Sequence, residues 1–142
     1  MNNAERLHHV MAAEQTVTRL YYTLDRSDYS GASRCFVPGG IWERSGSALH
    51  GHEQILASLN KRPATLLTRH YVSNFLVLEQ TASSAKVAFN LAVYRSDKGE
   101  APALPVAGTV PAMLAEVECE LTCNEQGDWL IQRLDPLITF TA

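Results

Sequence analysis

Asp25 and His70 are two polar residues whose types and positions could support chemistry. Asp25 stands at the end of a stretch with helical periodicity, one turn after Tyr21, where the helix dipole disfavours an anion. His70 lies inside a stretch with the composition of a strand. A carboxylate that binds one imidazole nitrogen leaves the other free to move a proton, which is general acid–base chemistry. Taken alone, Asp25 also fits a solvated acid at a turn, and His70 fits either a satisfied core residue or a pocket wall.

Metal chemistry and nucleophilic catalysis find less support in the sequence. His50 and His52 flank Gly51 near the start of a helix, but a zinc site needs three or four ligands and no third ligand lies nearby. We therefore expect no metal. The chain also lacks a GxSxG motif, a phosphate-binding glycine loop and an HExxH motif.

The three cysteines, Cys35, Cys119 and Cys123, include no CxxC pair. Cys119 and Cys123 fall on one predicted strand, about 13 Å apart at ~3.3 Å per residue, which is too far for a disulfide. Reduced thiols are typical of the cytoplasm, and the first residues show no secretory signal. We therefore expect a cytoplasmic protein.

The elements that must position Asp25 and His70 follow from the periodicity of apolar residues. Helical spacing from Ala4 to Asp25 predicts one long amphipathic helix. A short helix is predicted next, N-capped by Ser27 or Asp28 and ending near Cys35-Phe36. Pro38-Gly39-Gly40 is predicted to break the chain. A short strand at Ile41–Arg44 and a third helix at about His52–Asn60 are predicted to follow.

The second half of the chain has the period of strands. Four strands are predicted, at Arg69–Glu79, Ala85–Arg95, Met113–Cys123 and Trp129–Phe140, with a long loop at Ser96–Thr109. Helices followed by a strand meander indicate an α+β fold, with a curved antiparallel sheet whose one face is covered by helices. The mouth between the long helix and the sheet is the expected pocket. Strand alternation places His70, Val72 and Asn74 on one face.

Composition limits the classes of partner. A chain of 142 residues, 46% hydrophobic and 19% charged, predicts a single domain over residues 1–142. The formal net charge is −3 and no basic cluster exists, so we expect no nucleic-acid partner. The longest apolar runs, such as Phe75–Leu78, are far too short to span a membrane, so we expect no membrane partner.

Several segments, taken in their order and spacing, resemble one known family. The segments are Leu20–Tyr29, Trp42-Glu43, Leu49–Ile55, Arg69–Asn74 and Gly127–Arg133. Together they resemble the SnoaL-like branch of the nuclear transport factor 2-like superfamily. The resemblance implies a cone-shaped fold of three N-terminal helices on a strongly curved mixed or antiparallel sheet, a homodimer formed through that sheet, and chemistry without a cofactor.

The resemblance also implies roles for individual residues. Asp25 falls where dehydratase-type members hold an aspartate, and His70 falls on their catalytic strand histidine. Asn90 lies near the place of a second dehydratase histidine, and Glu118 near that of a polar residue that contacts the substrate; both depart from the family's residue types. The residues expected to shape the pocket and bind substrate are Tyr21, Trp42, Glu43, Asn74, Asn90 and Glu118.

Glu43 offers a second route within the same resemblance. It lies close to the place of the general base in ketosteroid isomerase-like members, and Tyr21 is one residue from the tyrosine donor of that family. A carboxylate in an apolar pocket could take a proton alpha to a carbonyl while a hydroxyl stabilises the enolate.

The leading hypothesis is a cofactor-free lyase or isomerase that acts on a small, largely apolar ring compound bearing a carbonyl or hydroxyl group. His70 would be the general acid–base residue, and Asp25 would orient it. The alternative is a non-catalytic ligand-binding or partner subunit, like the small subunits of ring-hydroxylating dioxygenases. The enzyme hypothesis requires Asp25 and His70 within about 2.6–3.2 Å of each other, beside a pocket of roughly 300 Å³ or more.

Overall fold

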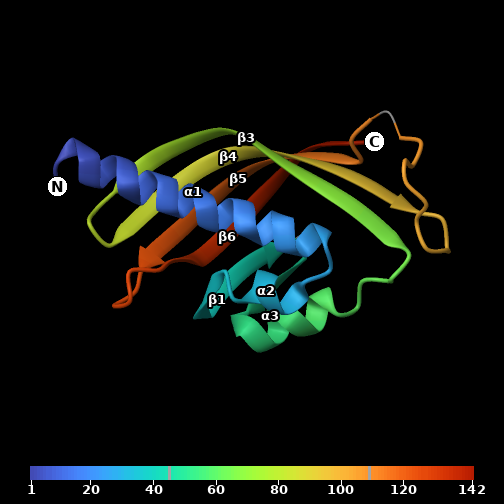
Figure 1. Ribbon diagram of the computed structural model, residues 1–142, viewed down its shortest axis with the longest axis horizontal. Coiled ribbons are helices and arrows are strands. Elements are labelled where there is room, and N and C mark those ends of the chain that lie inside the picture. The colour runs from blue at the N-terminus through green and yellow to red at the C-terminus, as the bar shows by residue number, and fades with distance from the viewer. Residues whose placement is uncertain (45, 109) are drawn as a thin grey trace.

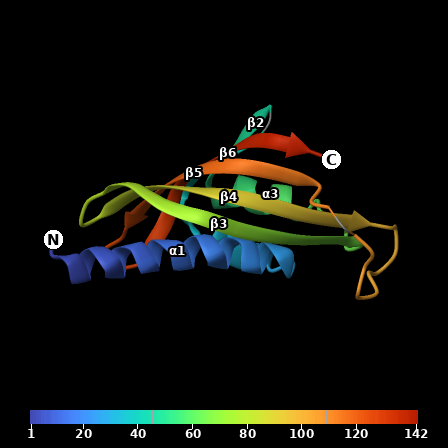
Figure 2. The same ribbon diagram turned by 90° about the horizontal axis from the view of Figure 1, so that it is seen from above.

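The computed structural model describes residues 1–44, 46–108 and 110–142. Over these residues three helices lie against one face of a six-stranded mixed sheet that does not close (Figures 1 and 2). The elements are α1 (Asn3–Asp25), α2 (Tyr29–Ser33), β1 (Phe36–Arg44), β2 (Ser47–His50), α3 (Gly51–Leu59), β3 (Leu66–Gln80), β4 (Ser84–Asp97), β5 (Met113–Cys123) and β6 (Trp129–Thr141). The predicted α+β class is confirmed.

The sheet has the strand order β2-β1-β6-β5-β4-β3. All neighbours run antiparallel except β1 and β6, which are parallel. This order makes β3, the strand that holds His70, one edge of the sheet. Figure 2 shows α1 running alongside β3.

The helix α1 begins with a capping box. The Asn2 side chain accepts a hydrogen bond from the Glu5 backbone N–H at 2.8 Å, and the Glu5 carboxylate accepts one from the Asn2 N–H at 2.9 Å. The apolar residues of its second half, which include Val17 and Leu20, are buried against the inner face of the sheet, whereas Leu7 and Met11 nearer its start are exposed. The helix therefore has a fixed position, and its last residue, Asp25, comes to lie beside β3.

A β-bulge divides β3 into two segments. Ser73 pairs with Asn90 and Leu76 pairs with Ala88, so Asn74 and Phe75 together lie opposite a single residue of β4. Asn74 has a φ of 56°, which is left-handed backbone. The extra residue reverses the alternation: Phe75 packs against the core, as Val72 does, and Asn74 is exposed. The prediction that Asn74 shares a face with His70 is therefore wrong.

The region around Pro38-Gly39-Gly40 is strand rather than a break. β1 begins at Phe36, and its pairing with β6 is irregular between Phe36 and Ile41. A Cβ on Gly40 would lie 3.0 Å from the Ile131 carbonyl oxygen, so the close approach of the two strands favours glycine there. The strand β2 was not predicted either, because four residues are too few to show alternation.

The remaining strands follow the predicted pattern, with ends shifted by a few residues. The strand β4 continues to Asp97, so the predicted Ser96–Thr109 loop begins later, and Thr109 lies outside the described residues. Cys35, Cys119 and Cys123 are free thiols, as predicted. Among the helices of the described ranges, none is long and apolar enough to cross a membrane.

Candidate active site

Asp25 and His70 meet where the end of α1 contacts β3. Asp25 Oδ1 lies 2.5 Å from His70 Nδ1, and the side chains are only 5% and 9% exposed. The His70 backbone N–H donates to Asp25 Oδ2 at 2.7 Å, and the Thr68 hydroxyl donates to Oδ1 at 3.0 Å. Both carboxylate oxygens are thus held, and the carboxylate in turn holds one edge of the imidazole.

The hydrogen bonds determine the ionisation of Asp25. Burial alone would raise its pKa, but the bonds and charge of His70, its backbone N–H and the Thr68 hydroxyl outweigh burial and hold the Asp25 pKa below its usual value. An ionised carboxylate can only accept hydrogen bonds, so Nδ1 of His70 carries a proton. In the neutral imidazole Nε2 then has the lone pair. Nε2 makes no hydrogen bond with any described residue, so it is available as a base.

Tyr21 packs against one face of the His70 imidazole. Its ring stacks on that of His70 with centroids 5.1 Å apart and an interplanar angle of 21°. The Tyr21 ring also makes an edge-on contact with the ring of Phe89. Burial raises the pKa of the Tyr21 phenol far above its usual value, with smaller contributions from Cys119 and Asp25, so the hydroxyl stays protonated.

An open groove of about 350 Å³ lies beside the pair, between α1 and β3. Its lining combines aromatic rings, two arginines and the Asp25–His70 pair: Thr18, Tyr21, Tyr22, Asp25, Arg26, Arg69, His70, Tyr71 and Val72. The groove has the size of a small-molecule site. Of the predicted substrate-binding residues, only Tyr21 lies here.

Asn74, Asn90 and Glu118 gather elsewhere, on the outer face of the sheet. All three line a separate cavity of about 500 Å³ there. Asn90 and Glu118 alternate along their strands with residues that are buried on the inner face, and Asn74 joins them through the bulge. The prediction that these side chains contribute to one site with His70 is therefore wrong.

Trp42 and Glu43 also lie away from the pair. Trp42 is buried in the core, where its ring stacks on Phe36 at 5.6 Å between centroids. Glu43 forms an ion pair with Arg133 of β6, with Oε1 and Nη2 3.0 Å apart. This carboxylate is paired and partly exposed rather than enclosed in an apolar pocket with Tyr21, so the second route through Glu43 is wrong.

We predict a small effect for Glu43→Gln. The Glu43–Arg133 pair is partly exposed on both sides, and such pairs contribute about 0.2–1 kcal/mol. Urea unfolding of this variant is expected to show a loss within that range. A loss several times larger would indicate a structural role for Glu43 that the pair does not explain.

Comparison with known proteins agrees with this fold. The SnoaL-like domain family matches residues 5–135. The chain belongs to the SnoaL-like family. No curated protein matches the chain.

Solved structures share the SnoaL-like fold at low sequence identity. A provisionally assigned scytalone dehydratase from Novosphingobium aromaticivorans matches with a TM-score of 0.85, 16% identity, and coverage of 99% of this chain and 91% of that one. A hexachlorocyclohexane dehydrochlorinase, LinA type 2, matches with a TM-score of 0.82, 14% identity, and coverage of 99% and 92%. ActVI-ORFA from Streptomyces coelicolor matches with a TM-score of 0.75, 16% identity, and coverage of 90% and 95%.

Sequence reasoning missed two residues that support the pair in this SnoaL-like domain. Thr68 donates to Asp25 Oδ1, and Arg69 Nη1 donates to the backbone carbonyls of Thr68 at 2.7 Å and Asp25 at 3.3 Å. A signal for Thr68 existed, because a residue two positions before His70 on a strand shares its face. Arg69 gave no such signal, since its side chain starts on the opposite face and passes around the sheet edge.

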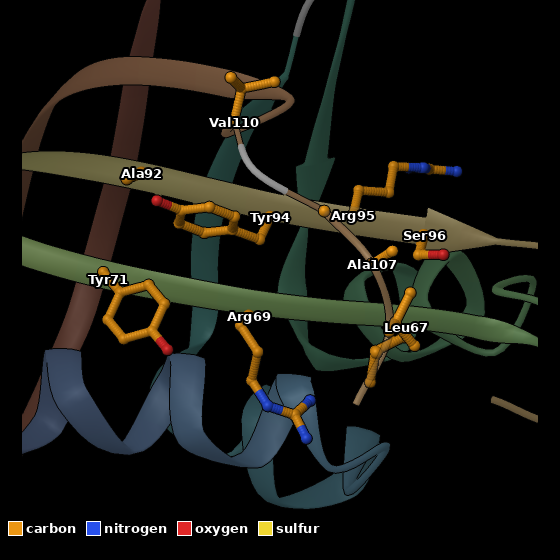
Figure 3. Close-up of a pocket in the computed structure, with 11 residues that line it drawn as sticks. Leu67, Arg69, Tyr71, Ala92, Tyr94, Arg95, Ser96, Ala107 and Val110 are labelled. Atoms are coloured by element: carbon orange, nitrogen blue, oxygen red, sulfur yellow. The ribbon is translucent and has the colours of Figure 1, made fainter. Parts of the chain in front are cut away.

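A further cavity, of about 440 Å³, lies on the outer face of β3 and β4 in the SnoaL-like domain. Figure 3 shows the rings of Tyr71 and Tyr94 side by side there, with Val110 above them, and the Arg69 side chain extending past β3 toward the helices. Arg69 and Tyr71 also line the groove beside His70. In the described parts of the chain, no three His, Cys, Asp or Glu side chains are arranged to hold a metal ion.

Proposed function

We propose that the protein is a lyase or isomerase in which His70 is the general acid–base residue and Asp25 its orienting partner. The observation that supports this most strongly is the 2.5 Å contact between Asp25 Oδ1 and His70 Nδ1, made beside a groove of about 350 Å³. The proposed substrate is a small, largely apolar ring compound with a carbonyl or hydroxyl group, because aromatic side chains form much of the groove wall.

In the proposed reaction, Nε2 of His70 takes a proton from the carbon alpha to a carbonyl. The electron pair of the broken C–H bond moves toward the carbonyl oxygen and forms an enolate, while Asp25 stabilises the imidazolium. In an isomerase the imidazolium returns the proton to another carbon. In a lyase it protonates a leaving hydroxyl, which departs as water. Arg26 and Arg69 line the same groove, and their charges favour the developing oxyanion. The proton moves only between His70 and the substrate, so the scheme requires no cofactor.

Solvent deuterium exchange tests this proposal. A panel of polyketide-like and steroid-like ketones is first screened for binding by thermal shift, and each bound compound is then incubated with the protein in D₂O. We expect NMR to show deuterium at the carbon alpha to the carbonyl with the parent protein, and much less with Asp25→Asn. A compound that binds but exchanges no faster than in buffer alone would favour the non-catalytic ligand-binding subunit.

We also propose that a second copy of the chain covers the outer face of the sheet. Large apolar side chains stand exposed on that face, including Tyr71, Leu76, Tyr94, Leu137 and Phe140. A two-fold pair of such faces buries the same residues on both copies, and stable interfaces of this kind cover about 800 Å² per partner. The cavity beside Tyr71 and Tyr94 would then lie inside the interface.

Light scattering at micromolar concentration tests the dimer. Phe140 is 67% exposed, and Phe140→Asp is expected to convert a dimer into a monomer because it would bury an unpaired charge. Leu7→Asp is the matched control, since Leu7 is 61% exposed on α1, away from this face. A parent protein that is monomeric under these conditions would exclude the proposed dimer.

A further inference from the structure

A continuous chain of side-chain hydrogen bonds runs from Arg62 to His70. Arg62 Nη2 donates to Thr68 Oγ1 at 2.8 Å, and Thr68 Oγ1 donates to Asp25 Oδ1 at 3.0 Å. The same Oδ1 accepts a hydrogen bond from His70 Nδ1 at 2.5 Å. Thr68 is only 4% exposed, so the middle of this series of hydrogen bonds is shielded from water. Four side chains from three parts of the sequence are thus joined in one line.

The chemistry of the donors sets the direction of every bond in this chain. A guanidinium has no acceptor, so Thr68 must accept from Arg62. The Thr68 hydroxyl has one proton, and with its oxygen facing Arg62 that proton points to Asp25. Oδ1 then receives a donor on one side from Thr68 and on the other from His70. This arrangement favours the imidazole form with its proton on Nδ1, and so leaves the lone pair on Nε2.

Arg62 is held in a place that is otherwise unfavourable for a cation. It lies in the turn between α3 and β3, fixed by the bonds from its own N–H to the Leu59 carbonyl and from the Leu66 N–H to the Pro63 carbonyl. Its Nε atom is buried and has no hydrogen-bond partner among the residues that the structure describes. Within the described ranges no carboxylate pairs with Arg62. The pKa of Arg44 is lowered mainly by the burial of Arg44 itself, and the nearby charge of Arg62 lowers it further.

We propose that Thr68 and Arg62 are positioning residues that fix the orientation of Asp25 and, through it, the tautomer of His70. This inference rests on the proposed function for its use in catalysis, but the tautomer itself can be measured without a substrate. The bond to Thr68 explains why a guanidinium lies partly buried without a carboxylate partner. A purely structural role would require Arg62 and Thr68 only for packing, and it would leave the imidazole unchanged when the protein stays folded.

The test is long-range ¹H–¹⁵N NMR of the His70 ring at pH 8 in the full-length protein. The parent is expected to show mainly the Nδ1–H form. Thr68→Val keeps the side-chain shape and removes the donor that holds Oδ1 in place. The carboxylate can then turn away from Nδ1, so the ratio of Nε2–H to Nδ1–H is expected to rise about tenfold, as expected when a hydrogen bond to a charged group no longer favours one form. Thr68→Ser should restore the parent ratio. Arg62→Met should shift the ratio in the same direction by less, and Arg62→Lys should partly restore it.

Thr65→Val is the matched control. Thr65 also donates to an aspartate, Asp97, at 2.7 Å, but that pair has no bond to His70, so its loss should not change the tautomer ratio. If folded Thr68→Val keeps the parent ratio, the positioning role is wrong, whether or not the protein has an activity. If the ratio shifts but no substrate exchanges deuterium, the positioning role stands and the proposed function fails. With an identified substrate, Thr68→Val should lower kcat about tenfold and leave KM unchanged.

Discussion

Replacing His70 by glutamine is expected to lower kcat/KM by about 10²–10⁴-fold, the usual contribution of a general acid–base residue. Glutamine is similar in length, and its amide N–H can still donate to Asp25 Oδ1 in place of Nδ1–H, but it cannot take up and return a proton near neutral pH. The effect should fall on kcat more than on KM, because proton transfer belongs to the transition state. The measurement is steady-state turnover of a compound identified by deuterium exchange.

The control for this variant is His8→Gln. His8 is exposed near the start of α1, whereas the groove lies beside the other end of that helix. Circular dichroism should show that both variants are folded. Turnover by His70→Gln at the parent rate would remove His70 from the mechanism. The remaining explanation for the Asp25–His70 contact would then be structural.

Asp25→Asn is expected to lower the free energy of unfolding by about 3 kcal/mol at pH 7. The carboxylate accepts bonds from three donors, namely the His70 ring, the His70 backbone N–H and the Thr68 hydroxyl. An amide can accept at one end only, and its NH₂ group faces a donor at the other. At least one buried donor therefore loses its partner.

The pH dependence of this loss follows from the lowered pKa of Asp25. A carboxyl group whose pKa is lower in the folded state stabilises the fold fully above its unfolded pKa, about 3.9, and loses that contribution as the pH falls through the folded pKa. The difference between parent and Asp25→Asn should thus be constant at neutral pH and shrink below about pH 4. Urea unfolding at a series of pH values measures it, with Glu14→Gln, at an exposed position of α1, as control. A difference that persists unchanged at pH 2.5 would contradict the prediction.

The sequence predicts the Asp25–His70 pair because two local signals and one pattern agree. An acid at the end of a helix is unfavourable, a histidine inside a strand needs a partner, and the order of segments resembles one family. The contact itself spans 45 residues, and no local rule connects its two ends. The resemblance supplied that connection, and the structure provides the distance.

Two physical causes account for the errors at Asn74 and Glu43. Alternation predicts faces only while the register is regular, and one extra residue at Asn74 moves that side chain to the other face. In the sequence alone Glu43 could be taken for a general base, because nothing nearby in the sequence pairs with its carboxylate. Its partner Arg133 is 90 residues away, on a strand that pairs in parallel with β1. Arg62 gave no signal for a similar reason, since its hydrogen bond to Thr68 depends on how the turn after α3 is folded.

The bulge at Asn74 also bears on how the protein avoids aggregation. The strand β3 is 15 residues long and forms an edge of the sheet, so it could serve as a template for the strand of another molecule. The kink at Asn74 breaks the straight run of backbone groups that such an addition would need, and the Arg69 side chain places a charge across the same edge. The residue that upsets the prediction of faces thus helps to keep one molecule from extending the sheet of the next.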